Sequence, residues 1–362
     1  MKTKFLTIVL GTILMVGCNT IEQPTMELET ISFGTNMIDL STGRSTRALV
    51  DNEALTGSGF AVYVTAVMNG SQRLYPVNGT SYGERISRDA QTAKWLPYST
   101  SNIKTWQSGN TYSFNGFTYL PTGATSNGSL TIETLGRQIR VNQPETYNQN
   151  TMVDYLYSHT FSVSDGRLRP VVQLDLEHAM ALVEVRIAKH ESIGDAYLDE
   201  VRVENFWRSA TMNCQSPAVC NSGQSNVWEV SFTAGTEKNT TYSRSGRHPQ
   251  DAGAAEPLVP LVERDQEESV LLSFVAIPQK MEATNLLTVS FWVNEKFDQY
   301  SPDNYVHHEA TFELYDYTPL FWQSGHRITY VLEVDTGIHL RGVINPWVDV
   351  DYIEGTVLPE QK

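Results

Sequence analysis

Basic residues are scarce in this sequence, and charge of either sign is low. Its 362 residues include 26 Lys and Arg against 41 Asp and Glu, a net charge of −15. Because a field of that sign repels phosphate backbones, nucleic acid is a poor candidate partner. Only 19% of residues are charged, while 40% are hydrophobic and 17 are Tyr. This balance favours extracellular β-structure with a sizeable core, and the length fits two domains.

Several motifs of the common catalytic classes are missing too. The chain has no HExxH, no P-loop and no GxGxxG followed by a helix. His307 and His308 are adjacent, so on a strand their rings point to opposite faces and cannot easily share a metal. Asp349 and Asp351 match a calcium loop only faintly, because the turn glycine and the bidentate acid are misplaced. We therefore expect no catalytic residues, no metal and no cofactor.

Two other groups of residues could suggest a site. His178 lies near Asp175 and Glu177, but within a strand-like run, where a hydrogen-bonded structural histidine is the expected role. The Trp residues could form a sugar-stacking platform, yet they are dispersed, so we expect most of them to pack in the core or at strand edges. The seven are Trp95, Trp106, Trp207, Trp228, Trp292, Trp322 and Trp347.

Long apolar runs are absent, and the longest segment of this kind is residues 5–17. It is mostly apolar, follows Lys2 and Lys4, and is too short to cross about 30 Å of hydrocarbon as a helix. Residues 1–17 therefore read as a signal peptide. The run ends in Val-Gly-Cys18, which resembles a bacterial lipobox, so we expect lipidation of Cys18 and membrane anchoring. The alternative is an ordinary secretory signal with a chance cysteine.

Cys214 and Cys220 are the other two cysteines of the chain. Five residues separate them, and in an oxidising periplasm they could close a small loop through a disulfide. A metal pair is disfavoured because its usual spacing is shorter and two further ligands are lacking nearby. Two free thiols remain the alternative.

Period-2 alternation of apolar residues recurs along the chain, and no 15-residue window shows a clean helical period. Such strands with one polar face predict antiparallel sheets and β-sandwiches. Turn signals such as Asn69-Gly70 separate the runs. The expected strands lie around residues 60–68, 183–187, 201–203, 287–293, 310–314 and 328–334.

The expected units are residues 18–47, an N-terminal β-sandwich at 48–169 and a C-terminal β-sandwich at 170–362. In the first unit, one strand with a bulge near Thr30 would place Met26, Leu28, Ile31 and Phe33 on one face. A Ser/Thr/Gly-rich stretch with Arg44 and Arg47 follows. Exposed small-residue loops are where proteases cut, so cleavage after Arg47, before Ala48, is expected. An uncut tether is the alternative.

Several segments, in order, resemble the fimbrillin (type V pilin) superfamily of outer-membrane lipoproteins. The motifs that carry the resemblance are Cys18, Ile31-Ser-Phe33, Thr46-Arg47-Ala48, Phe60-Ala-Val-Tyr63, Trp95, Trp106, the aromatic strand 112–121, Asp154-Tyr-Leu-Tyr157, Leu176-Glu-His178-Ala-Met180, Ala276-Ile-Pro-Gln279, residues 322–330 and Ile344-Asn-Pro-Trp347. One departure is Asn115-Gly116, where the family has bulky residues and where the glycine suggests a bulge.

The resemblance implies an all-β fold of two transthyretin-like antiparallel β-sandwich domains and a structural subunit of an adhesive surface fimbria. Family members lose their N-terminal strand to an arginine-specific protease, and the vacated groove accepts a strand from the next pilin subunit. The expected location is therefore the outer membrane, then the cell-surface fimbrium. Residues 26–33 would cover an edge of the first sandwich, and the donor strand could be the region 352–358. A non-polymerising surface lipoprotein that binds glycans or proteins is the alternative.

Overall fold

The computed structural model describes thirteen stretches of the chain: residues 29–37, 62–75, 83–88, 95–121, 131–133, 138–147, 152–213, 231–234, 240–251, 253–262, 270–294, 305–334 and 338–346. The predictions for Cys18, Arg47, Ala48, Cys214 and Cys220 lie outside these residues and stay predictions. Among the stretches described, no helix is long and apolar enough to cross a membrane.

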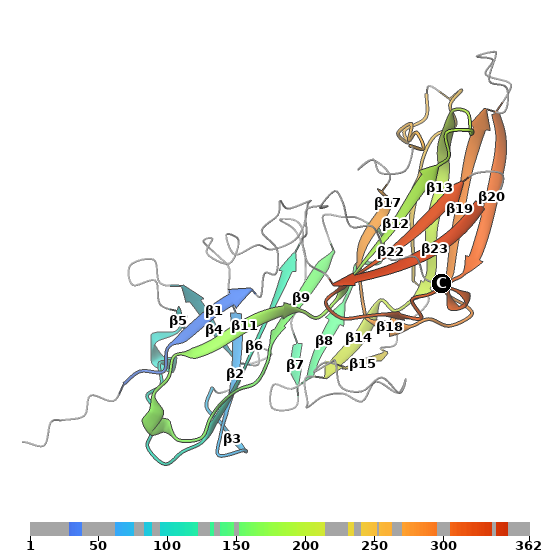
Figure 1. Ribbon diagram of the computed structural model, residues 1–362. Helices are drawn as coiled ribbons and strands as arrows, with labels where there is room; N and C mark the ends of the chain where they lie inside the picture. The colour runs from blue at the N-terminus through green and yellow to red at the C-terminus, as the bar shows by residue number, and fades with distance from the viewer. Residues whose placement is uncertain are drawn as a thin grey trace, which may run out of the picture.

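The largest sheet has nine strands in the order β10-β6-β9-β11-β1-β5-β4-β2-β3. Its strands are β1 (Phe33–Met37), β2 (Val62–Met68), β3 (Gln72–Arg73), β4 (Glu84–Arg88), β5 (Trp95–Pro97), β6 (Tyr112–Pro121), β9 (Val153–Ser158), β10 (Phe161–Val163) and β11 (Val172–His178). Strand β6 also pairs with β2. Seven of the strands, β6-β9-β11-β1-β5-β4-β2, therefore close into a ring around one core (Figure 1).

The other end of the molecule holds two four-stranded sheets, β17-β12-β22-β23 and β16-β13-β19-β20 (Figure 1). Apolar residues such as Val183, Val185 and Ile328 are fully buried and alternate with polar ones along these strands. The inner residues of both sheets belong to one core, which makes a sandwich. The strands are β12 (Ala181–Lys189), β13 (Ala196–Phe206), β16 (Thr240–Ser245), β17 (Val270–Ala276), β19 (Leu286–Asn294), β20 (Tyr305–Glu313), β22 (His326–Val334) and β23 (Ile338–Pro346).

A smaller sheet, β15-β14-β8-β7, joins the two ends. It comprises β7 (Thr131–Glu133), β8 (Gln138–Asn142), β14 (Ser209–Asn213) and β15 (Ser231–Ala234), and a two-stranded ladder pairs β18 (Gln279–Lys280) with β21 (Phe321–Trp322). Three 3-10 turns complete the described elements: η1 (Thr100–Asn102), η3 (Gly166–Leu168) and η6 (Leu314–Asp316). The predicted all-β sandwich class is confirmed, and all six expected strand regions are found.

Two features of the pairing differ from expectation. The sheets are not purely antiparallel, because β1 runs parallel to β11 and β12 runs parallel to β22. The strand that follows the expected boundary at residues 169 and 170 is β11, and it belongs to the first sheet between β9 and β1. The division into two domains stays a prediction, because Phe117 and Tyr155 of that sheet also contribute to the core of the other end.

The expected bulge at Asn115-Gly116 is wrong, because β6 pairs with β2 in unbroken register from Tyr63–Phe117 to Met68–Tyr112. Gly116 instead lies where its neighbours leave little room for a side chain. A Cβ there would lie 3.1 Å from Leu174 Cδ1 and 3.3 Å from Ser158 Oγ. The Ser158 hydroxyl also accepts the Gly116 N–H at 2.7 Å, at the point where the neighbour of β6 changes from β9 to β10.

Candidate functional site: the position of strand β1

Strand β1 comes from the segment that precedes the expected cleavage point, and it is an interior strand of the ring. It pairs with β11 over five residues, from Phe33–Val172 to Met37–Leu176. On its other side a single residue pair, Phe33–Trp95, joins it to β5. In Figure 1 the blue β1 lies alongside the green β11. The ring is therefore closed by one long ladder and one very short one.

The residues just before β1 are also held by the backbone. The Ile31 N–H donates to the Lys104 carbonyl at 2.8 Å, and the Glu29 carbonyl accepts the Trp106 N–H at 3.0 Å. Thr30 forms an isolated bridge with Thr105. These bonds extend the paired segment towards the N-terminus, so that residues 29–37 form a continuous inserted element.

Two apolar side chains anchor this element in the ring core. Ile31 is fully buried and Phe33 is 3% exposed. The Phe33 ring meets the Phe114 ring edge to face, with centroids 6.0 Å apart. Phe114 in turn lies 5.8 Å from Trp106, which is 5.0 Å from Tyr112. Burial of Ile31 and Phe33 stabilises the inserted element by about 1.5–3 kcal/mol each.

The expected strand at residues 26–33 is correct in its buried pair, Ile31 and Phe33, and its residues 29–33 belong to the inserted element. The ladder begins at Phe33 and continues to Met37, and Met26 and Leu28 lie outside the described residues. The inserted element fills the space between β11 and β5, so it covers a pairing edge of each of these strands. Alternation within residues 26–33 predicted which side chains are buried, but it could not tell an edge strand from an interior one.

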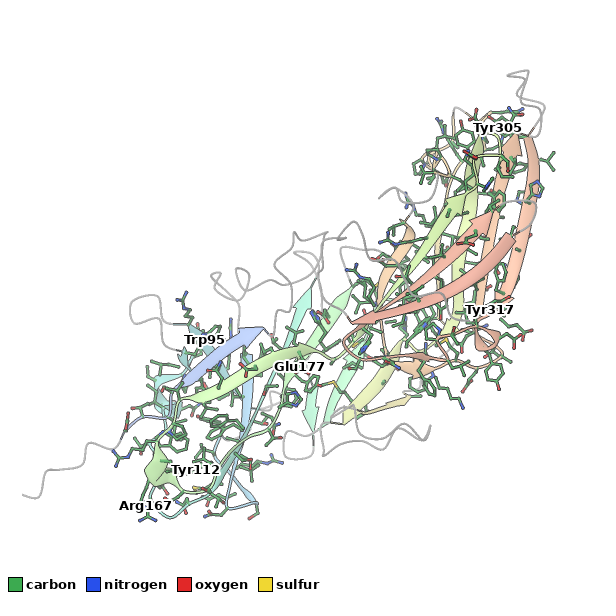
Figure 2. The ribbon with its side chains drawn as sticks, in the orientation of Figure 1. Trp95, Tyr112, Arg167, Glu177, Tyr305 and Tyr317 are labelled. Carbon is green, nitrogen blue, oxygen red and sulfur yellow. The ribbon has the colours of Figure 1, made fainter. Side chains whose placement is uncertain are left out.

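Charged groups at the N-terminal end of the inserted element contribute little to holding it in place. Glu29 and Arg169 are 3.8 Å apart, and the Glu29 side chain is 62% exposed, so this surface pair adds at most about 1 kcal/mol. Nearby, hydrogen bonds from the Arg167 side chain and backbone hold the pKa of Asp165 well below its usual range. Figure 2 places Arg167 and Tyr112 together at this end of the molecule. The inserted element is therefore held mainly by its ladder and its two apolar side chains.

The histidines singled out in the sequence each have a partner in the fold. His178 Nδ1 lies 2.7 Å from Asp154 Oδ2, and the Asp154 side chain is 1% exposed. Asp175 and Glu177 point to other partners, so the His178 cluster does not assemble. His307 packs on Trp292 and His308 on Phe291, which confirms that their rings lie on opposite faces. No group of three potential metal ligands is assembled within the described stretches.

The described tryptophans divide between core and surface. Trp95 and Trp106 line the ring core, and Trp322 is buried and donates its indole N–H to Tyr330 at 3.0 Å. Trp292 is only half-buried and has two histidines beside it, which the sequence analysis did not anticipate. A signal was present, because alternation puts Trp292 on the polar face of its strand with Ser290. Trp228 and Trp347 lie outside the described residues.

One spacing typical of a catalytic motif is present in the chain: Gly79, Ser81 and Gly83 are spaced as G-x-S-x-G. A nucleophile elbow with this spacing connects a strand to a helix. Here Gly83 leads directly into strand β4, so the spacing gives no support for a hydrolase.

Comparisons with known proteins agree with the fold. The family model described as fimbrillin-like matches residues 46–347. A fimbrial protein from Bacteroides vulgatus is 12% identical with a TM-score of 0.57, and the match covers 88% of this chain and all of that one. A cell adhesion protein from Bacteroides uniformis, described as putative, is 12% identical with a TM-score of 0.47, over 90% of this chain and all of that one. Among curated proteins, none matches. Since the family model spans most of the sequence, the chain belongs to the fimbrillin-like family.

Proposed function

We propose that the protein is a structural, non-catalytic subunit of an adhesive surface fimbria, stored with β1 in place and assembled after β1 leaves. Membership of the fimbrillin-like family supports the fimbrial role. The observation that carries the storage step is the place of β1 in the ring, between β11 and β5, ten residues before Arg47. A cut after Arg47 leaves β1 attached to the body by non-covalent contacts alone.

Departure of β1 would change the ring in two ways. It would expose the pairing edges of β11 and β5, and an exposed edge is a template for a strand from another chain. It would also open the positions that Ile31 and Phe33 fill in the core. A strand with apolar side chains two residues apart could then take the same place, supplied by another pilin subunit. The region 352–358 remains our candidate donor.

Cleavage can be tested on purified residues 19–362 with an arginine-specific protease. We expect a fragment that begins at Ala48 and, after release of the N-terminal piece, heat-sensitive ladders on electrophoresis. Such ladders reflect slow dissociation, because release of an inserted strand exposes the whole groove. Single substitutions Arg44→Ala and Arg47→Ala show which arginine is cut, and only the blocking substitution should abolish the ladder.

Two outcomes would count against this function. Polymers that form equally well from the uncut Arg44→Ala, Arg47→Ala double variant would show that cleavage does not control assembly. A clean cut with no polymer under any condition would favour the alternative of a non-polymerising surface lipoprotein.

The membrane step is a separate proposal. We infer that Cys18 carries lipid that anchors the subunit to the outer membrane before processing. Cys18→Ala should move the uncut protein from the membrane fraction to the soluble periplasm. Membrane association and processing that are unchanged in this variant would contradict lipidation.

A further inference from the structure

An aromatic cluster covers one end of the outer face of the sheet β16-β13-β19-β20. Tyr197, Trp292 and His307 are register partners on three neighbouring strands, β13, β19 and β20. The rings of Trp292 and His307 are 4.5 Å apart. His248 meets the other side of the cluster, 4.4 Å from Trp292, and Tyr305 lies 5.8 Å from Tyr197. We call these five residues the surface aromatic cluster.

An irregularity in β13 positions a carboxylate next to the surface aromatic cluster. The register between β13 and β19 shifts between Leu198 and Glu200, so Asp199 is the extra residue of a β-bulge. Bulges re-aim side chains and are frequent beside functional sites. Asp199 Oδ2 accepts hydrogen bonds from Ser290 at 2.8 Å and from His307 at 3.0 Å. The Asp199 side chain remains 38% exposed, and both of these hydrogen bonds reach the same oxygen, Oδ2.

The ionised state of Asp199 is favoured in this setting. Partial burial by itself would raise the pKa of Asp199, but the hydrogen bonds from Ser290 and His307 outweigh it and lower the pKa. The indole N–H of Trp292 also faces this carboxylate, although it makes no hydrogen bond of normal geometry. A fixed acceptor therefore lies beside half-exposed rings, on a face where alternation places polar residues.

The surface aromatic cluster lies far from the β1 site. Figure 2 shows Tyr305 at one extremity of the molecule and Arg167 at the other. Strand β20, which carries Tyr305 and His307, is the edge strand of its sheet. The cluster is thus separate from the elements that the proposed assembly uses.

We propose that the surface aromatic cluster and Asp199 form a carbohydrate-binding site for a neutral glycan. Neighbouring strands are about 4.8 Å apart, so the row Tyr197-Trp292-His307 extends over about 10 Å, the length of about two linked pyranose rings. The apolar C–H faces of a sugar pack on aromatic rings, and its hydroxyl groups donate to a fixed carboxylate oxygen such as Asp199 Oδ1. The net charge of −15 and the ionised Asp199 disfavour sialylated, sulfated or phosphorylated ligands.

A neutral sugar fits this geometry better than a cationic side chain does. A cage for a cation surrounds one point with ring faces. Here the rings follow a line across three strands, and the nearest carboxylate already accepts two donors on one oxygen. An edge-to-edge contact with a second copy is the other competing use of this surface, and the test below includes it.

The test measures binding by the uncut chain, so that it does not depend on assembly. Lactose, cellobiose and maltose are titrated at millimolar concentrations by saturation-transfer NMR. An array of neutral, sialylated and sulfated oligosaccharides then gives the specificity. We expect binding to neutral glycans, and a loss of affinity of about tenfold in both Trp292→Ala and Asp199→Asn. Asp199→Asn preserves the side-chain size, and Tyr98→Ala, which removes a 69% exposed ring at the other end, is the matched control.

Four results would overturn the site: no binding to any sugar of the panel, binding that both variants retain, preference for anionic glycans, or self-association that Trp292→Ala abolishes. Melting curves of each variant show whether the fold is intact. If Trp292→Ala does not fold, Asp199→Asn decides alone. Failure of this test leaves cleavage-dependent ladder formation unaffected, so the two proposals fail independently.

Discussion

Two of the strand pairs described in this structure are parallel, and they are held very differently. Strands β12 and β22 are in register over eight residues, from Leu182–Arg327 to Lys189–Val334, and each has a further long ladder on its other side, with β17 and β23. Strands β1 and β11 are in register over five residues, and on its other side β1 meets β5 at a single pair. The parallel pair of the sandwich thus has long ladders on both sides, whereas β1 in the ring has a long ladder on one side only.

This difference indicates which strand can leave. Removing β12 or β22 would break two ladders and expose a core that extends through both sheets of the sandwich. Removing residues 29–37 breaks one five-residue ladder, a single pair with β5 and the backbone contacts with residues 104–106, and it withdraws two large apolar side chains from the core. Local opening occurs where few contacts hold a segment. The amide hydrogens of β1 should therefore exchange with solvent through detachment of β1, and the free energy of this detachment should be well below that of global unfolding.

The largest effect is expected from Phe274→Ala in the sandwich core. Phe274 is 1% exposed and packs on Phe206, Tyr242 and Trp322. Its truncation should lower the free energy of unfolding by about 3–5 kcal/mol, measured by denaturant titration. Val306→Ala, at a 41% exposed position, is the control and should cost under about 0.5 kcal/mol. A loss under about 1 kcal/mol for Phe274→Ala would show that this core is not the stable half.

Phe33→Ala tests the other half of the comparison. It removes an equally buried ring, but its cost to global stability should be smaller than that of Phe274→Ala, because β1 can detach before the rest unfolds. The amides of residues 33–37 should exchange faster with solvent, as hydrogen-exchange mass spectrometry can show. An equal global cost without faster local exchange would mean that β1 is as integral as β12.

Gly116→Ala should have an intermediate effect, of about 1–3 kcal/mol, because the added methyl group crowds Leu174, Ser158 and Val62. Leu174 is the register partner of Thr35 in β1, so the crowding reaches the ladder that holds β1. Thermal unfolding measures the loss. Gly253→Ala is the control, since a Cβ there meets nothing nearer than 3.7 Å. A neutral Gly116→Ala would show that the ring is loose at this point.

The smallest expected effect is the pH dependence of stability that Asp199 contributes at the sandwich end. The pKa of Asp199 is lower in the folded chain than in the unfolded one, so its contribution is present above the unfolded value of about 3.9 and is lost as the pH falls through the folded pKa. With its side chain 38% exposed, the contribution is under about 1 kcal/mol. The melting temperature of the wild type should therefore fall slightly more than that of Asp199→Asn between about pH 5 and pH 2. Parallel curves for the two proteins would rule out this linkage.

Local patterns along the chain were sufficient to predict many of the strands and their buried faces. Alternation at Val183 and Val185, at Ile328 and Tyr330, and at Ile31 and Phe33 was enough, because successive side chains of a strand point to opposite sides. Asn69-Gly70 likewise predicted its turn, and both residues have positive φ values, as a tight hairpin requires. These features depend on near neighbours in the chain.

Which strands are neighbours, by contrast, is visible only in the folded chain. A period of two gives the face of a strand but not its partner, so the parallel pairing of Phe33 with Val172, 139 positions further along the chain, has no local signal. The same holds for closure of the ring through β6 and β2, and for the meeting of Tyr197, Trp292 and His307 on three strands. Each is set by long-range packing, because burial of a whole core selects the pairing that no single segment specifies.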